Sequence, residues 1–90
     1  MDRRVVITGI GVLSAIGQGK DAYWEALRRG ASGVRPITLF DTAPFRVKNG
    51  GEIADFDAVA YLGKKGLREL DRSTRLVCSA AKLALDDSRL

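Results

Sequence analysis

A near-continuous apolar run close to the N-terminus restricts the folds open to this chain. Residues 5–7 are Val, Val and Ile, and Ile10 follows after a Thr-Gly step. Such a run predicts a strand that is buried on both faces, as in a sheet with helices on either side. A chain of 90 residues buries only about 60–65% of its unfolded surface, which leaves little material to cover that strand. We therefore expect residues 1–90 to be a fragment of a larger α/β unit.

Charge and cysteine content exclude several classes of function. The chain has 15 basic and 11 acidic residues, a net charge of +4, and the excess is spread along the sequence, whereas nucleic-acid binders concentrate it. One cysteine cannot form an internal disulfide, and without histidine there is neither a Cys/His zinc site nor an imidazole base. No apolar run approaches the roughly 20 residues of a membrane span, and no secretory signal pattern is present. These features predict a cytoplasmic protein that binds neither nucleic acid, membrane nor metal.

Two segments have clear helix signals. Residues 21–29 carry apolar side chains at helical spacing and are followed by Gly30 as a stop, which predicts an amphipathic helix of about three turns. Residues 71–90 form the strongest predicted helix, with Asp71 or Ser73 as its N-cap and no internal Gly or Pro. Apolar residues fill well over half of its circumference, which predicts a helix packed between two layers of structure. The narrow polar remainder consists of Arg75, Ser79, Lys82 and Asp86.

The segment between these helices is expected to be irregular. Two prolines and a Gly-Gly pair lie within residues 36–51 and forbid a long regular element. Residues 45–48 alternate apolar and basic side chains, which predicts one short edge strand. Residues 51–54 could pair with that strand or continue it past a bulge, and residues 57–63 are expected to form a one-turn helix.

The glycines of residues 9–17 do not match a phosphate-binding loop. A dinucleotide loop needs G-x-G-x-x-G directly between a strand and a helix. Here apolar side chains stand where that loop should turn, and Ser14 replaces the third glycine. The P-loop pattern fails at Asp21, where Ser or Thr is required. We therefore expect no nucleotide cofactor.

Few side chains could carry covalent chemistry. Cys78 lies about two turns into the last predicted helix, in a chain without histidine, and is interpreted as a structural thiol. Ser14 has no base partner and is expected to bond the backbone of its own loop. Asp86 and Asp87 are adjacent on a helix and point about 100° apart, so they cannot share a reacting atom and are expected to form a solvated helix end. No catalytic residue is assigned within residues 1–90.

A short cluster of cations precedes the last predicted helix. It consists of Lys64, Lys65, Arg68 and Arg72. Such a cluster is either a solvated face or a docking patch that steers an acidic partner electrostatically.

Four ordered stretches of the chain resemble the N-terminal part of β-ketoacyl-acyl-carrier-protein synthases, the elongating condensing enzymes of fatty-acid and polyketide assembly. The stretches are 3–17, 23–41, 50–57 and 70–90, and they cover essentially the whole chain at the family's spacing. The resemblance implies an α/β fold of the thiolase-like class, layered α/β/α/β/α with two similar halves. Residues 1–90 would be an N-terminal fragment of the β-ketoacyl synthase N-terminal domain, incomplete in this chain. The glycines of the first stretch then resemble those that let the first core strand turn tightly into the next helix.

The same resemblance implies an activity for the parent protein. It is the decarboxylative Claisen condensation of an acyl thioester with malonyl-acyl carrier protein. In the family a cysteine takes the acyl chain from the carrier's phosphopantetheine, two histidines assist decarboxylation, and all three lie beyond residue 90, so this chain alone should be inactive. The resemblance further implies no cofactor bound by the chain, acyl carrier protein as partner, a homodimer or ketosynthase-like heterodimer, and carrier docking at Lys65 and Arg68.

Some positions depart from the family pattern, and two alternatives stay open. Ala15 stands where proline is usual, Ser88-Arg89 replace Ala-Gly, and Glu69 stands where many relatives have a basic residue. The parent could instead be a catalytically inactive, chain-length-factor-like subunit. The chain could also be a small module that binds a carrier protein through its basic cluster.

Overall fold

Both predicted helices are present, with Gly30 as the expected stop of the first and Asp71 as an expected cap of the second. The structure is a computed structural model that describes residues 2–89. Helix α1 spans Lys20–Arg29 and ends at Gly30, whose φ of 68° is a left-handed conformation that suits glycine. Helix α3 spans Arg72–Ser88. The carboxylate of Asp71 accepts a hydrogen bond of 2.8 Å from the Thr74 amide, so Asp71, not Ser73, is the N-cap.

Helix α3 ends on a residue that does not favour the conformation it adopts. Arg89 has a φ of 60°, the left-handed region in which glycine is the usual residue after a helix. Arg89 is one of the positions at which a departure from the resembled family was expected. Leu90, the last residue of the predicted helix, lies outside the described residues.

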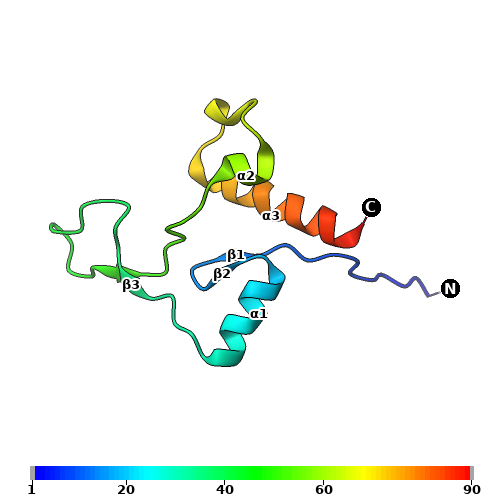
Figure 1. Ribbon diagram of the computed structural model, residues 1–90, viewed down its shortest axis with the longest axis horizontal. Helices are drawn as coiled ribbons and strands as arrows, with labels where there is room; N and C mark the ends of the chain where they lie inside the picture. The colour runs from blue at the N-terminus through cyan, green and yellow to red at the C-terminus, as the bar shows by residue number, and fades with distance from the viewer. Residues whose placement is uncertain (1, 90) are drawn as a thin grey trace.

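The strand predicted at residues 5–10 is not formed. This segment runs beside α3 without pairing to any other part of residues 2–89 (Figure 1). Val5 and Ile7 are 93% and 84% exposed. The apolar run is present, but a strand exists only when neighbouring strands satisfy its N–H and C=O groups, and no strand among the described residues pairs with this segment.

Two glycines bring this N-terminal segment into backbone contact with α3. A Cβ on Gly9 would collide with the carbonyl oxygen of Ala84, and a Cβ on Gly11 with that of Ala80. Neither glycine has a positive φ. Gly9 and Gly11 are therefore required here for close approach to the helix, and not for a tight turn.

Residues 35–50 form a projecting arm (Figure 1), and its strand pairing differs from the prediction. Strand β3 (Arg35–Pro36) pairs antiparallel with β4 (Asn49–Gly50), and the Ile37 amide donates to the Lys48 carbonyl at 2.9 Å. Residues 45–48 are not a strand, because the Lys48 ammonium donates to three carbonyls of the turn at residues 42–45 and curls the chain there. Pro36 is tolerated because a two-residue ladder consists only of edges.

Three shorter elements complete the described chain. The one-turn helix expected within residues 57–63 is α2, Ala58–Leu62, capped by Asp57, whose carboxylate accepts from the Val59 amide. Strands β1 (Leu13–Ser14) and β2 (Gly17–Gln18) form an antiparallel hairpin just before α1. The 3-10 helix η1, Leu67–Glu69, connects α2 to α3.

Burial on α3 also differs from the prediction. Val77 and Leu85 are 68% and 56% exposed, so the described residues do not enclose α3 between two layers. Ser79, predicted on the polar side, is fully buried, and its hydroxyl has no hydrogen-bond partner among the described residues. Helix α2 packs across α3 (Figure 1), and the buried residues of the two helices, Ala58 and Ser79, are small enough to permit close approach.

We predict that residues 1–90 in isolation do not unfold cooperatively. The apolar side chains buried among the described residues are only Ala26, Ala58 and Leu67, a core too small to offset the conformational entropy of folding. Circular dichroism at increasing temperature should show gradual loss of helix, and a dye that reports exposed apolar surface should bind at low temperature. A single sharp and reversible transition would contradict this expectation.

Candidate functional site

A charged tip, residues 63–69, projects between α2 and α3 (Figure 1). It carries the predicted docking residues Lys65 and Arg68 together with Lys64, and all three side chains are exposed. None of them forms a hydrogen bond or an ion pair with another residue in the part of the chain that the structure describes. Three cations are therefore presented to solvent without a partner.

The backbone of this charged tip is held firmly from below. Leu67 is only 9% exposed and anchors η1 in the small core. The guanidinium of Arg75 donates to the carbonyls of Leu67 at 2.7 Å and Leu70 at 3.0 Å. Gly66 supplies the left-handed turn, with φ 84°, that leads into η1. Arg75 was expected only on the narrow polar side of the last helix. It instead holds the backbone of η1, a role that no local sequence pattern indicates.

The fourth cation of the predicted cluster has a structural role. Arg72 donates from Nη2 to the Ile53 carbonyl at 2.7 Å, and its guanidinium carbon lies 5.7 Å from the centroid of the Phe56 ring. That ring stacks on Tyr61, with centroids 6.1 Å apart, and the Tyr61 hydroxyl donates to the Gln18 side chain at 2.6 Å. Arg72 therefore ties α3 to the segment before α2 and does not belong to the exposed group.

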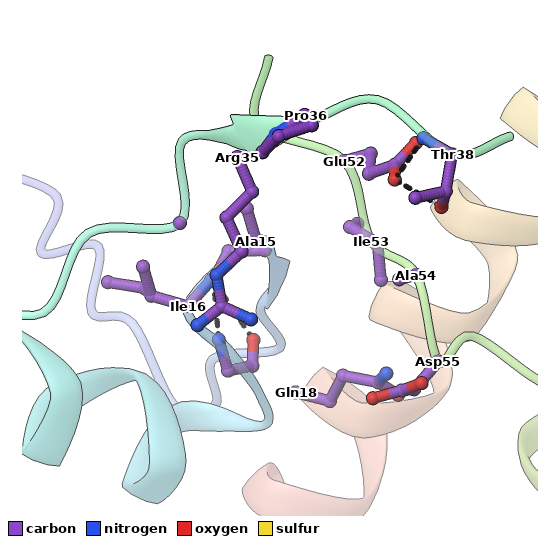
Figure 2. A pocket seen from close by; sticks show the side chains of 13 residues that line it. Ala15, Ile16, Gln18, Arg35, Pro36, Thr38, Glu52, Ile53, Ala54 and Asp55 are labelled. Atoms are coloured by element: carbon purple, nitrogen blue, oxygen red, sulfur yellow. Dashed lines mark hydrogen bonds between the residues drawn. The ribbon is translucent and has the colours of Figure 1, made fainter. Parts of the chain in front are cut away.

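A hollow of about 500 Å³ lies between the β1–β2 hairpin, β3 and residues 52–55. Figure 2 shows the Arg35 side chain extending from β3 toward the hairpin, with Gln18 and Asp55 at the other end of the hollow. The Glu52 carboxylate is already engaged, because it accepts from the Thr38 amide and hydroxyl at 2.8 and 2.6 Å and from the Leu39 amide. These hydrogen bonds, led by that of the Thr38 hydroxyl, lower the pKa of Glu52. No sequence pattern pointed to this hollow.

Ser14 lines this hollow but is not a free nucleophile. Its hydroxyl donates to the Gly17 carbonyl at 2.9 Å and accepts from the Gly17 amide at 3.2 Å and, more weakly, from that of Ile16. The prediction that Ser14 bonds its own loop is confirmed. Ala15 follows Ser14 in this turn, at a position where proline would fix the backbone φ.

Cys78 has no arrangement around it that would activate a thiol. It is a free, partly exposed cysteine within α3, and the sequence has no histidine. Within residues 2–89 no group of three His, Cys, Asp or Glu side chains is placed to hold a metal ion. Neither Ser14 nor Cys78 is thus paired with a base.

The acidic end of α3 does more than face solvent. Asp87 accepts a hydrogen bond of 3.0 Å from the Ile10 amide and forms an ion pair with Lys20 of α1. Asp86 pairs with Lys82 at 2.6 Å. The prediction of a solvated end was therefore wrong for Asp87, since its partners lie far away in the sequence and only the tertiary structure brings them together.

Comparison with known proteins identifies the class. The family model described as "Beta-ketoacyl synthase, N-terminal domain" matches residues 2–90. The chain therefore belongs to the β-ketoacyl synthase N-terminal domain family, as its resemblance implied.

Individual relatives are similar over the whole chain. It is 38% identical over 88 residues to 3-oxoacyl-[acyl-carrier-protein] synthase 2 of Synechocystis sp., covering 98% of this chain and 21% of that protein. It is 45% identical over 91 residues to "Granaticin polyketide putative beta-ketoacyl synthase 1" of Streptomyces violaceoruber, covering 100% of this chain and again 21% of the relative. The chain spans about a fifth of the length of these relatives.

A solved structure confirms the fold class. "The ishigamide ketosynthase/chain length factor" superposes with a TM-score of 0.91 at 42% identity, over 98% of this chain and 22% of that chain. The described elements therefore follow the path of part of a thiolase-like ketosynthase domain. No helix among residues 2–89 is long and apolar enough to cross a membrane.

We predict that both contacts of Asp87 persist across neutral pH, that its hydrogen bond with the Ile10 amide is lost in acid, and that its ion pair with Lys20 is lost in acid and in strong base. The hydrogen bond from Lys20, followed by that from the Ile10 amide and then by the charge of Lys20, lowers the pKa of Asp87 from its ordinary 3.8, while Asp87 raises the pKa of Lys20 from 10.5. The contribution of Asp87 is complete above its ordinary pKa and is lost as the pH falls through the lowered value. That of Lys20 is complete below 10.5 and is lost above the raised value. The amide resonance of Ile10, followed with nitrogen-labelled isoleucine, should stay constant between about pH 5 and pH 9; a titration within that window would refute the assignment.

Proposed function

We propose that residues 1–90 are the N-terminal part of the β-ketoacyl synthase N-terminal domain of a longer condensing enzyme. The observation that carries this proposal is the family match over residues 2–90, in a chain that spans only 21% of its relatives. The exposed apolar residues of the N-terminal segment and of α3 support it, because they are surfaces that need a covering partner.

The proposed reaction of the longer protein is decarboxylative condensation. An acyl group is first held as a thioester on an enzyme cysteine, after transfer from the phosphopantetheine of acyl carrier protein. Malonyl-carrier protein then loses carbon dioxide, and the resulting carbanion attacks the acyl carbonyl. A carbon–carbon bond forms, the bond from the acyl carbon to the cysteine sulfur breaks, and the products are 3-oxoacyl-carrier protein and the free thiol.

Residues 1–90 contribute scaffold and binding surface to this reaction, and no catalytic group. We place the cysteine and the two histidines outside them, which agrees with the absence of histidine from the sequence and with the surroundings of Cys78. The substrates arrive on the carrier's own phosphopantetheine, so this part of the enzyme holds no cofactor.

The carrier protein is proposed to dock on the charged tip, at Lys65 and Arg68. Both side chains are exposed and unpaired within the described region, and the backbone beneath Arg68 is fixed by Leu67 and Arg75. A rigid group of cations steers an acidic partner and fixes its orientation. We further propose a dimer that works in the cytoplasm, where a free thiol such as Cys78 stays reduced.

A second candidate is a ketosynthase-like subunit that lacks the catalytic cysteine. One observation favours it: the solved structure that superposes at a TM-score of 0.91 is titled as a ketosynthase together with a chain length factor. Such a subunit would pair with an active ketosynthase and have no condensing activity of its own.

The first test is the reading frame that follows residue 90, combined with an assay of its product. An open frame that includes a cysteine and two later histidines, and whose protein releases carbon dioxide from malonyl-carrier protein, establishes the condensing enzyme. A frame that lacks the cysteine establishes the inactive subunit. A stop after residue 90 would contradict both and leave a small carrier-binding module. Residues 1–90 alone are expected to give no condensation product in the same assay.

Reversal of one charge on the charged tip should weaken carrier binding. We expect Arg68→Glu in the longer protein to raise the KM for malonyl-carrier protein by about tenfold at low salt, because an exposed attraction becomes a repulsion. The effect should shrink as salt increases, and kcat should change little. Arg46→Glu is the matched control, since Arg46 is exposed on the projecting arm without a hydrogen bond or ion pair to another described residue. Equal KM values for the two variants would contradict the proposal that the carrier protein docks on the charged tip.

A further inference from the structure

One carboxylate interrupts the charged tip. Glu69 follows Arg68 directly in η1 and is exposed. Its side chain forms no hydrogen bond or ion pair with any residue of the described range. The acidic side chains nearest to the charged tip in the sequence, Asp57 and Asp71, are engaged as the caps of α2 and α3. Glu69 is thus the unengaged carboxylate within the charged tip, whose other charged side chains, Lys64, Lys65 and Arg68, are all positive.

The backbone that carries Arg68 and Glu69 is fixed on both sides. The carbonyls on either side of the pair, those of Leu67 and Leu70, are both held by the Arg75 guanidinium at 2.7 and 3.0 Å. The Leu70 amide also donates to the Leu67 carbonyl at 3.0 Å. Successive residues of a 3-10 helix point about 120° apart. The side chains of Arg68 and Glu69 therefore leave this fixed turn in different directions, which separates the positive group from the negative one.

A fixed pair of opposite charges is complementary to a partner surface that places a negative group opposite the cation and a positive group opposite the anion. We propose that Glu69 determines which carrier protein is accepted: it favours an acidic docking surface that carries one basic side chain opposite Glu69, and it disfavours a surface that is acidic throughout. The inference rests on the docking role proposed above for Arg68 and Lys65. Charges placed to repel wrong partners are a general source of specificity at exposed interfaces.

The experiment uses the longer protein and one carrier protein in several versions. One version has no Lys or Arg on its acidic surface, and the others have a single Lys introduced at each exposed position of that surface in turn. Dissociation constants are measured at low and at high salt for the unchanged enzyme and for Glu69→Gln. Glu25→Gln is the control, because Glu25 lies on α1 and is paired with Arg28 of the same helix. Unchanged thermal unfolding confirms that the substitutions leave the fold intact.

The proposal makes a pairwise prediction. At one Lys position, binding to the unchanged enzyme should strengthen by about two- to fivefold at low salt, the range of an exposed ion pair. Glu69→Gln should abolish that gain and should strengthen binding of the uniformly acidic carrier, and Glu25→Gln should do neither.

The outcomes separate this inference from the docking role itself. If Arg68→Glu weakens binding while Glu69→Gln alters no ratio between carrier versions, the charged tip docks carriers and Glu69 does not select among them. If neither substitution has an effect, both the inference and the docking role fail. A gain from Lys that survives Glu69→Gln would also overturn the inference, because the new cation would then act through another group.

Discussion

The carboxylate of Asp87 joins three parts of the chain that are far apart in sequence. It accepts from the Ile10 amide and pairs with Lys20, so the N-terminal segment and α1 are both held to the end of α3. The close approach of Gly9 and Gly11 to the α3 backbone makes this geometry possible. Helix α3 is consequently the platform of the described chain: the N-terminal segment, α1 and α2 are all attached to it (Figure 1).

The same helix organises the charged tip from its other end. Asp71 caps α3, and Arg75, one turn further on, reaches back to the carbonyls of η1. The docking proposed for the charged tip would benefit from such support, because a preorganised charge loses little entropy when a partner binds. By contrast, the projecting arm is held mainly by hydrogen bonds that the side chains of Glu52 and Lys48 form with its own backbone. Phe45, near the turn of the arm, is 55% exposed.

Several failures of sequence-based prediction share one cause. Hydrophobic periodicity indicates which side chains are suited to burial, but it does not indicate whether the element that would cover them belongs to the same stretch of chain. Val5, Ile7, Val77 and Leu85 have the pattern of buried residues, yet they are exposed in residues 2–89. The chain matches the family over residues 2–90 but spans only 21% of a relative's length. These exposed apolar residues are therefore suited to packing against further parts of a thiolase-like domain. Ser79 shows the reverse case, a polar residue that is buried because it is small.

Local physics allowed the sequence to determine the end of α1 at Gly30, the start of α3 at Asp71, the short helix after Asp57 and the self-bonded Ser14 loop. The family was indicated by the resemblance of four ordered stretches. Caps, glycine stops and hydroxyl–backbone bonds involve residues within a few positions of one another, so their signal is contained in short stretches. Only the tertiary structure decided that Arg72 and Arg75 support the backbone while Arg68 and Glu69 face solvent, that Asp87 binds Ile10 and Lys20, and that β3 pairs with β4. Those contacts depend on how distant segments pack, and a side chain's chemistry alone does not specify which of several possible partners it will meet.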